Sequence, residues 1–420
     1  MNGVRPYSLY VIGVLLAVYT FNFIDRVVLG ILVAPIKVEL HLTDTQLGLI
    51  GGTAFALFYT ALGIPVGRLA DRANRVWIMS AALALWSAFT AVCGLAHSFL
   101  ALFCARLGVG VGEAGGVAPA YALISDYFPP RARARALGVY SLGVPLGSAL
   151  GLLFGGYIAT HFSWRAAFLA LGFAGLALAP LLLATVGDPG RGAGDRQTAR
   201  RFDPSWCEVA RTLAHKPGFW LLSVGAGCGS IMGYGLLFWL PSFFMRTYGM
   251  TLIEVSRLLG ALLLIGGSAG IVLGGYLADR HGPRRPSAYA LIPALAFVCI
   301  LPCYAVGTSL RAGAGAFCCF LIAAALQVAW LGPVITAIQH LVPAAMRALA
   351  SALFLFINNL LGLGLGSLIL GFASDRLAAH FGAASLRIAI LGGSAFYLIA
   401  AALLLLAAGR LPRDFEPGAR

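Results

Sequence analysis

Apolar segments long enough to cross a membrane recur along this whole chain of 420 residues, and no other feature restricts its fold as strongly. Hydrophobic residues make up 60% of the sequence and charged residues only 10%. A helix of about 20 predominantly apolar residues spans the hydrocarbon core of a bilayer, whereas a water-soluble domain could not bury this many such segments. The sequence therefore predicts an all-α polytopic membrane protein.

Twelve transmembrane helices are expected, and the basic residues between them predict their orientation. The spans fall near residues 9–32, 46–66, 76–96, 99–124, 136–159, 166–186, 220–244, 255–277, 288–306, 313–340, 348–373 and 386–408. Of the 29 Lys and Arg residues, twenty lie in the connectors and termini on one side, seven lie on the other side and two lie within spans. Because positive charge collects on the cytoplasmic side, we expect both termini in the cytoplasm. The same distribution explains the net charge of +14, so we expect no nucleic-acid partner.

One long connector divides the chain into two halves of six spans each. We expect an N-terminal bundle over residues 1–187, a cytoplasmic linker over 188–216 and a C-terminal bundle over 217–420. The apolar residues that recur at helical spacing in the linker are Trp206, Val209, Ala210 and Leu213. This spacing predicts a short helix on the membrane surface, and a flexible linker is the alternative.

The two halves are related by an internal repeat. A helix-capping sequence at Thr43 recurs at Thr251, the residues from Gly67 recur from Gly275, and a looser match aligns 129–136 with 343–348. The first two pairs are each 208 residues apart. Parallel repeats related by an axis along the membrane normal are typical of transporters, in which the substrate site lies between the halves near the middle of the membrane. We therefore expect two pseudo-symmetric six-helix bundles.

Two spans of the first half carry charged side chains. Arg106 and Glu113 lie in the fourth span, and Asp25 and Arg26 lie in the first span close to Asn22. A charge at the bilayer centre costs at least about 2.5–3.5 kcal/mol, so such residues mark ion or substrate pathways. We expect Asp25 to pair with Arg106 in at least one state, and we expect all four charged side chains to serve proton coupling or substrate binding. A charge network that only orients the helices is the alternative.

The connectors after the second and eighth spans carry the most specific motif. Residues 67–75 read GRLADRANR, and residues 275–285 read GYLADRHGPRR. The glycine lets helices approach closely, while the acid and the arginines can form contacts in one state that break in the other. The expected residues of this cytoplasmic gate are Gly67, Asp71, Arg72, Arg75, Gly275, Asp279 and Arg280. A turn whose charges only set the membrane topology is the alternative.

This duplicated loop resembles the signature of the major facilitator superfamily, and the first half more closely resembles the Spinster family within it. The matching motifs are Asn22-Phe-Ile-Asp25-Arg26, Asp44-Thr-Gln-Leu-Gly48, Arg106-Leu-Gly-Val-Gly-Val-Gly-Glu113-Ala114 and Val144-Pro-Leu-Gly-Ser148. The resemblance implies the twelve-helix major facilitator fold, and it puts Asp25, Arg106 and Glu113 at the family's coupling positions. It also implies a bacterial member in the inner membrane that is proton-linked, whereas eukaryotic members export sphingolipids and lysophospholipids. This chain has Gly115-Gly116-Val117 where animal members commonly have Ser-Tyr-Ser, a departure at the substrate site.

The charged positions of the first half have no counterpart in the second half. The residue 208 positions after Asp25 is Gly233. We therefore expect the second half to supply an apolar wall with a few polar contacts. The cavity candidates, together with Asn22, are Tyr234, Phe238, Trp239, Asn358 and Asn359. Packing between helices or against lipid is the alternative for each aromatic residue.

These features predict a proton-coupled secondary transporter that moves an amphiphilic lipid, such as a lysophospholipid or a sphingolipid, by alternating access. The alternative is a proton-linked symporter or exporter of a small organic acid or a drug-like compound. A receptor with a transporter's fold would bind without flux. A lipid enzyme would need a nucleophile with a base, or metal ligands, near one membrane interface, and the spacing of the residues provides neither. We expect a monomer without cofactor, metal or enzymatic activity, whose partners are the substrate, protons and membrane lipids.

Overall fold

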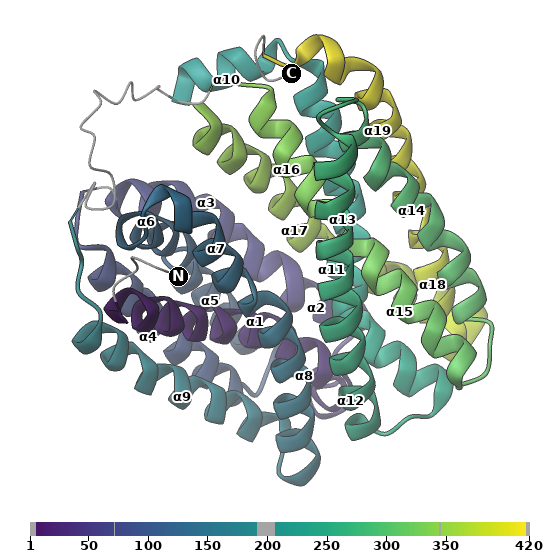
Figure 1. The fold of residues 1–420 in the computed structure, drawn as a ribbon. Coiled ribbons are helices and arrows are strands. Elements are labelled where there is room, and N and C mark those ends of the chain that lie inside the picture. The colour runs from purple at the N-terminus through teal and green to yellow at the C-terminus, as the bar shows by residue number, and fades with distance from the viewer. Residues whose placement is uncertain (1–5, 71, 191–205, 344–345, 417–420) are drawn as a thin grey trace. The chain divides into compact units, whose positions relative to one another are not determined.

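Helices form all the regular secondary structure of residues 6–70, 72–190, 206–343 and 346–416, which are the residues that the structure, a computed structural model, describes (Figure 1). Among these residues, 11 helical stretches are long and apolar enough to cross a membrane. The last stretch, Leu349–Asp414, has 66 residues and contains parts of several helices, which is enough for two crossings. Each of the twelve expected spans overlaps one of these stretches.

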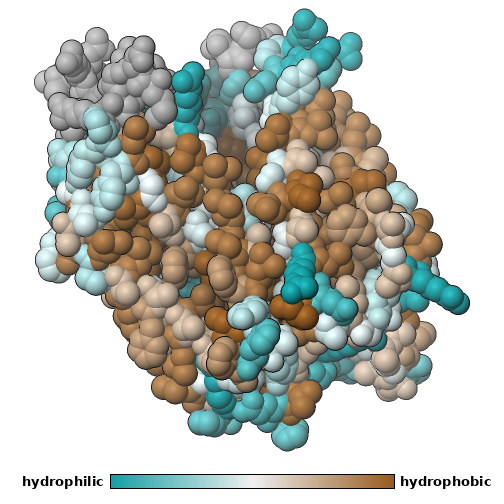
Figure 2. Space-filling model, turned by 60° about the horizontal axis from the view of Figure 1, so that its bottom comes forward, coloured by the Kyte–Doolittle hydropathy of each residue, from teal (hydrophilic) through white to brown (hydrophobic). Residues whose placement is uncertain are grey.

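Hydrophobic side chains cover most of the molecular face shown in Figure 2. Trp77, Phe162 and Val272 are among the large apolar side chains that are exposed. In water such a surface would promote aggregation. In a bilayer it lies against lipid tails that are as apolar as leucine, so it needs no protein cover.

The first of two structural units contains residues 1–200 together with 250–260. Its helices up to residue 185 are α1 (Pro6–Leu40), α2 (Asp44–Gly48), η1 (Leu49–Thr53), α3 (Ala54–Ala70), α4 (Arg75–Gly94), α5 (Phe99–Glu113), α6 (Val117–Tyr127), α7 (Pro130–Ser141), α8 (Gly143–His161) and α9 (Trp164–Thr185). Helix α5 packs directly on the backbones of its neighbours α3 and α4. A Cβ added at Gly112 would lie 2.5 Å from the main-chain nitrogen of Trp86, and one at Gly110 would meet the carbonyl of Phe55. These glycines therefore allow the close approach that positions α5.

The second unit contains residues 201–249 and 261–420. The helices from residue 206 onward are α10 (Trp206–Ala214), α11 (Pro217–Tyr248), α12 (Leu252–Leu262, shared with the first unit), η2 (Leu263–Gly267), α13 (Ser268–His281), α14 (Ala288–Gly307), α15 (Ala314–Val328), α16 (Leu331–His340), α17 (Arg347–Phe381), η4 (Gly382–Ala384), α18 (Ser385–Gly393) and α19 (Ala395–Asp414). The short helix predicted in the linker is present as α10, whose Val209 and Leu213 are buried. Helix α10 belongs to this unit because it packs on α11 and α17, and the expected bounds of the two bundles stay a prediction.

The internal repeat extends to the backbone. Both capping boxes form, since Thr43 N–H donates to Gln46 at 3.0 Å and Thr251 N–H donates to Glu254 at 2.8 Å. Each half of the sequence also has a π-helical segment in its second span, η1 and η2. The fourth span of each half is interrupted, between α5 and α6 in one case and between α15 and α16 in the other. Such rare π segments are frequent at functional sites.

Candidate functional site

The charged side chains predicted within spans lie together in unit 1. Arg26 of α1 donates its Nε–H to Oε2 of Glu113, the last residue of α5, at 2.8 Å. Glu113 is 0% exposed, and Arg106 is 1% exposed. The guanidinium of Arg26 lies 5.0 Å from the ring centroid of Phe55 and 4.5 Å from that of Tyr59. Burial of an ion pair costs several kcal/mol per ion, and the aromatic faces offset part of this cost.

Asp25 and Arg106 belong to the same cluster but interact differently from the expectation. Arg106 donates from a terminal guanidinium nitrogen to the main-chain carbonyl of Asp25 at 3.5 Å. The Asp25 carboxylate accepts a hydrogen bond from Thr90 of α4 at 2.9 Å. Successive helical residues point about 100° apart, so Asp25 is turned toward α4 while Arg26 reaches α5. In this structure Glu113, rather than Asp25, forms the cluster's ion pair, and an Asp25–Arg106 pair in another state stays a prediction.

Several buried polar atoms of this cluster have no hydrogen-bond partner among the described residues. They are Nε of Arg106, Oε1 of Glu113 and both amide atoms of Asn22. An unsatisfied buried polar group costs about 1–3 kcal/mol, and native proteins contain few of them. No group of three or more His, Cys, Asp or Glu within the described ranges is placed to hold a metal ion. Spare donors and acceptors at one place can instead receive a proton, a water molecule or a polar group of a ligand.

A second charged cluster joins three helix ends of unit 1 at the first gate motif. Arg75, the first residue of α4, pairs with Asp126 of α6 and with Asp188, which follows α9 and lies 2.7 Å from the guanidinium. The main-chain N–H of Arg75 also donates to Asp188 at 2.9 Å. Partial burial opposes the charge of Asp188, but the hydrogen bonds from Arg75 outweigh it and hold the pKa of this carboxyl below its usual value. The sequence analysis named Arg75 but missed both acids, because carboxylates at span ends do not stand out from ordinary connector charges.

The other expected gate residues make fewer contacts. A Cβ added at Gly67 would lie 3.9 Å from that of Ala118, and one at Gly275 would have no atom within 4 Å. Helices α13 and α16 nevertheless approach closely at Gly275, since a Cβ added at Gly332 would lie 3.4 Å from the Cα of Gly275. No such close approach is found at Gly67. Arg72 and Asp279 are exposed, and Arg280 donates to the hydroxyl of Tyr276 on its own helix at 2.8 Å. Asp71 lies outside the described residues.

Unit 2 carries an uncharged polar cluster that the sequence analysis missed. Gln327 of α15 donates to the carbonyl of Gly233 on α11 at 3.2 Å and accepts from the hydroxyl of Tyr304 on α14 at 3.2 Å. Gly233 is the counterpart of Asp25 in the repeat, and Gln327 precedes the interruption of its span as Glu113 does. The sequence feature that could have revealed this cluster is Gln327 itself, a single glutamine within an apolar span. Neutral groups in unit 2 thus correspond to the charged groups of unit 1.

Two of the expected cavity residues of unit 2, Trp239 and Asn358, form hydrogen bonds between α11 and α17. The indole N–H of Trp239 donates to the carbonyl of Ser367 at 2.8 Å, and the hydroxyl of Ser230 donates to the amide oxygen of Asn358 at 2.8 Å. Trp239 and Asn358 are both buried. The remaining candidates are Phe238, which is buried, and Tyr234 and Asn359, which are half-buried. The two hydrogen-bonded side chains hold the helices together in this structure, and the role of the set in a cavity stays a prediction.

Known proteins similar to this chain give its family. A sequence model of the Major Facilitator Superfamily matches residues 15–367. An MFS-type efflux pump of Mycolicibacterium smegmatis is 34% identical over 410 residues, which are 97% of this chain and 94% of that protein. Protein spinster homolog 1 of Xenopus tropicalis is 27% identical over 391 residues, 88% of this chain and 74% of that protein.

A solved structure agrees with these sequence relatives. The crystal structure of a bacterial homologue of the human lysosomal transporter Spinster, in an inward-facing and unoccupied conformation, superposes with a TM-score of 0.90 at 32% identity. The match covers 99% of this chain and 100% of that one. The predicted fold and the predicted resemblance to the Spinster family are confirmed, and the protein is a transporter rather than an enzyme. The chain belongs to the major facilitator superfamily, as a transporter of the Spinster type.

Proposed function

We propose that this transporter couples protons to the movement of an amphiphilic lipid with an anionic headgroup, such as a lysophospholipid or a sphingolipid-like molecule. The observation that carries the proposal is the buried cluster of unit 1. In it Glu113 is paired with Arg26, whereas Arg106 donates to a main-chain carbonyl and its Nε has no hydrogen-bond partner among the described residues. Transporters of this architecture work by alternating access, in which the two halves rock about the substrate site.

The charge count of the cluster supports proton coupling. Two carboxylates and two arginines are neutral together when both acids are ionised. A proton on Glu113 removes the partner of Arg26 and leaves an excess positive charge in surroundings where an unpaired charge is costly. An anionic group bound at either arginine restores neutrality. Proton and anion therefore favour each other's binding, which links a pH gradient to substrate movement.

The different character of the two units supports an amphiphilic cargo. Unit 1 supplies the charges, while the corresponding residues of unit 2, Gly233 and Gln327, are neutral. A molecule with a charged headgroup and an apolar tail suits this division. The resemblance to the Spinster family supports a lipid cargo as well.

The second candidate function is proton-linked transport or export of a small organic acid or a drug-like compound. It is favoured by the relative described as an efflux pump, which is 34% identical to this chain. A guanidinium with a free donor would bind a small carboxylate as readily as a phosphate ester. The proposal includes a monomer in a bacterial inner membrane with both termini in the cytoplasm, a location and orientation supported by the distribution of basic residues.

Flux into liposomes tests these proposals. Purified protein is reconstituted, and uptake of a labelled lysophospholipid is compared with uptake of a small carboxylate, with and without an imposed pH gradient. We expect lipid flux that rises with the gradient, and we expect the variant Glu113→Gln to lose this response. Glu208→Gln, which makes the same change at an exposed acid of α10, is the matched control and should transport normally. Flux of the carboxylate alone would favour the second candidate, and binding without flux would mean a receptor.

A further inference from the structure

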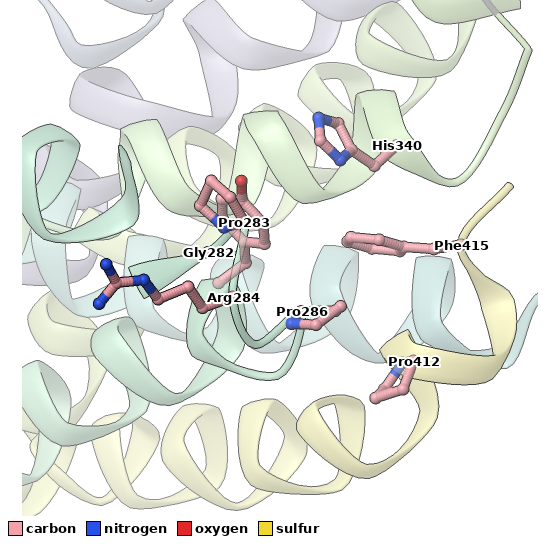
Figure 3. A pocket seen from close by; sticks show the side chains of 8 residues that line it. Gly282, Pro283, Arg284, Pro286, His340, Pro412 and Phe415 are labelled. Atoms are coloured by element: carbon pink, nitrogen blue, oxygen red, sulfur yellow. The ribbon is translucent and has the colours of Figure 1, made fainter. Parts of the chain in front are cut away.

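At the end of unit 2 where α19 terminates, three segments enclose an open pocket of about 390 Å³ (Figure 3). They are the loop between α13 and α14, the end of α16 and the end of α19. The ring centroids of His340 and Phe415 are 5.3 Å apart, and those of Tyr289 and His340 are 5.7 Å apart. Figure 3 shows His340 and Phe415 opposite the loop that carries Pro283 and Arg284. The pocket therefore has aromatic walls and a basic rim.

In unit 1 the corresponding place is filled by the Arg75 network. Helices α4 and α14 both have 20 residues, and the first residue is Arg75 in α4 and Ala288 in α14. Asp126 corresponds to His340, because each stands three positions before the proline that begins the matched segment. Ala288 has no side chain that could form such a network, and the arginines Arg284 and Arg285 of the second gate motif lie in the loop before α14. The aromatic ring of His340 replaces one of the two acidic partners of Arg75.

The walls of the pocket are held by hydrogen bonds that do not involve a ligand. The main-chain N–H of Glu416 donates to the carbonyl of His340 at 3.1 Å. Lys216 donates to the carboxylate of Glu416 at 2.6 Å and to the main-chain carbonyl of Asp414 at 3.0 Å. The C-terminal segment that carries Phe415 is thus fixed against α16. A preformed site loses less conformational entropy on binding than a flexible one.

The charges around the pocket favour an anion. Residues 279–286, 340–347 and 410–416 together contain six arginines and three carboxylates. Two of these carboxylates are already engaged, since Asp414 accepts from the main-chain N–H of Gly218 at 2.7 Å and Glu416 is bound by Lys216. The basic excess is therefore available to a ligand.

Two polar side chains of the pocket are available for direct contacts. Nδ1 of His340 is buried without a hydrogen-bond partner among the described residues. Arg284 is exposed, and no ion pair or hydrogen bond of its guanidinium is found in the part of the chain that is described. Figure 3 shows this guanidinium extending away from the rings, so binding requires a rotation of an unrestrained side chain.

We propose that this pocket binds the phosphate ester headgroup of an anionic lipid. Arg284 and His340 contact the phosphate, and Phe415 with the neighbouring Pro286 and Pro412 packs against the apolar part of the molecule. Basic pockets between transmembrane helices on the cytoplasmic side are the sites at which acidic headgroups bind. The site lies outside the charged cluster of unit 1, so the proposal concerns a resident lipid rather than the transported molecule.

The test measures lipid binding to the full chain in a neutral detergent, by native mass spectrometry and by the thermal unfolding midpoint. Phosphatidylglycerol, phosphatidylcholine, glycerol phosphate and inorganic phosphate are added separately. We expect only phosphatidylglycerol to bind tightly and to raise the midpoint. Arg284→Ala should weaken this binding about tenfold or more, because a charge-assisted contact is lost. His340→Phe, which keeps the ring and removes its nitrogens, should weaken it in the same direction.

Arg280→Ala is the matched control, because Arg280 belongs to the same connector but bonds to Tyr276 outside the pocket lining. Equal weakening by this control would mean diffuse charge attraction and would overturn the proposal, as would unchanged binding in Arg284→Ala. Equal stabilisation by inorganic phosphate would mean a free-anion site rather than a lipid site. Because Arg284 is exposed, its variant tests the proposal even if His340→Phe fails to fold.

Discussion

Arg26 and Glu113 are buried as partners, so each stabilises the charge of the other. Removal of one partner leaves an uncompensated charge, whereas replacement of both by apolar residues removes the desolvation cost as well. The variant Arg26→Leu should therefore lower the free energy of unfolding by about 3–5 kcal/mol. Chemical denaturation in detergent measures this loss.

The double variant Arg26→Leu with Glu113→Leu is the control for this prediction. It should recover much of the stability, although it should not transport. A double variant that is less stable than the single one would contradict the view that the lost partner is what destabilises Arg26→Leu.

Sequence reasoning found the members of the charged cluster but not their pairing. The apolar context of Asp25, Arg106 and Glu113 marked them as unusual, and their positions in the spans gave their approximate depth. Depth alone does not determine which way a side chain points around its helix axis. Adjacent residues such as Asp25 and Arg26 diverge by about 100°, so a small difference in helix rotation changes the partner. This rotation depends on close contacts such as Gly112 with Trp86, which no single sequence reveals.

Helix α5 can be tested through those contacts. In Gly112→Ala the new Cβ would lie 2.5 Å from the main-chain nitrogen of Trp86, so α4 and α5 would have to separate. Overpacking of this kind costs about 1–3 kcal/mol, and we also expect transport to fall because α5 carries Arg106 and Glu113. Gly13→Ala is the control, since nothing lies within 4 Å of its added Cβ and a glycine in a helix interior is replaced by a better helix former. Unfolding midpoints that are the same for both variants would refute the proposed role of the close approach.

The junction of α4, α6 and the end of α9 should be sensitive to acid. The folded-state pKa of Asp188 is held below its usual value, so its contribution to stability is complete above the unfolded pKa of about 3.9 and is lost as the pH falls through the folded pKa. At neutral pH, Asp188→Asn should reduce the free energy of unfolding by about 1–3 kcal/mol, because charge-assisted hydrogen bonds to Arg75 are lost. The difference from the wild type should shrink below about pH 4. Unfolding midpoints between pH 3 and pH 7 measure it, with Asp279→Asn as an exposed-acid control that should match the wild type throughout.

At the level of helices, hydropathy predicted the spans but not their interruptions. The fourth and tenth spans were expected to be continuous, yet α5 gives way to α6 and α15 to α16. A hydropathy window sums side-chain transfer energies and does not register the local hydrogen-bond pattern. The pair Gly115-Gly116 was the local signal of the first interruption, because glycine is a poor helix former. Each π segment contains a comparable pair, Gly51-Gly52 in η1 and Gly266-Gly267 in η2, which the sequence analysis did not use.

Across the whole molecule, the two repeats share their helical arrangement but differ in the charge of their buried polar residues. Asp25 and Glu113 in unit 1 correspond to Gly233 and Gln327 in unit 2. The same positions of the repeat therefore hold ionisable residues in unit 1 and neutral residues in unit 2. This asymmetry could be read from the sequence at Gly233, where the spacing is 208, but not at Gln327, where the spacing has changed. A connector that differs in length between the halves changes the number of residues between equivalent positions. A single sequence without relatives does not show where this change occurs.

This difference in charge predicts that substitutions in the two units change transport in different ways. Gln327→Leu should raise the KM for the transported molecule by up to about tenfold, the effect of one lost hydrogen bond, while the ratio of flux with and without a pH gradient stays unchanged. Glu113→Gln should instead reduce that ratio. Reconstituted transport at several substrate concentrations measures both quantities. Loss of the gradient response in Gln327→Leu would show that coupling is shared between the units.

Because the fourth span is interrupted after Glu113, α6 can tilt about residues 114–116 while α5 stays in place. Helix α6 has 11 residues and is therefore about 16 Å long, with Asp126 close to its far end. A tilt of about 10° at residues 114–116 would displace that end by about 3 Å, which exceeds the range over which a hydrogen bond survives. A small angular change beside Glu113, the acid that we propose to bind protons, is thus large enough to break the contact between Asp126 and Arg75. Rigid-body rotation of one short helix would then link the charged cluster to the first gate motif.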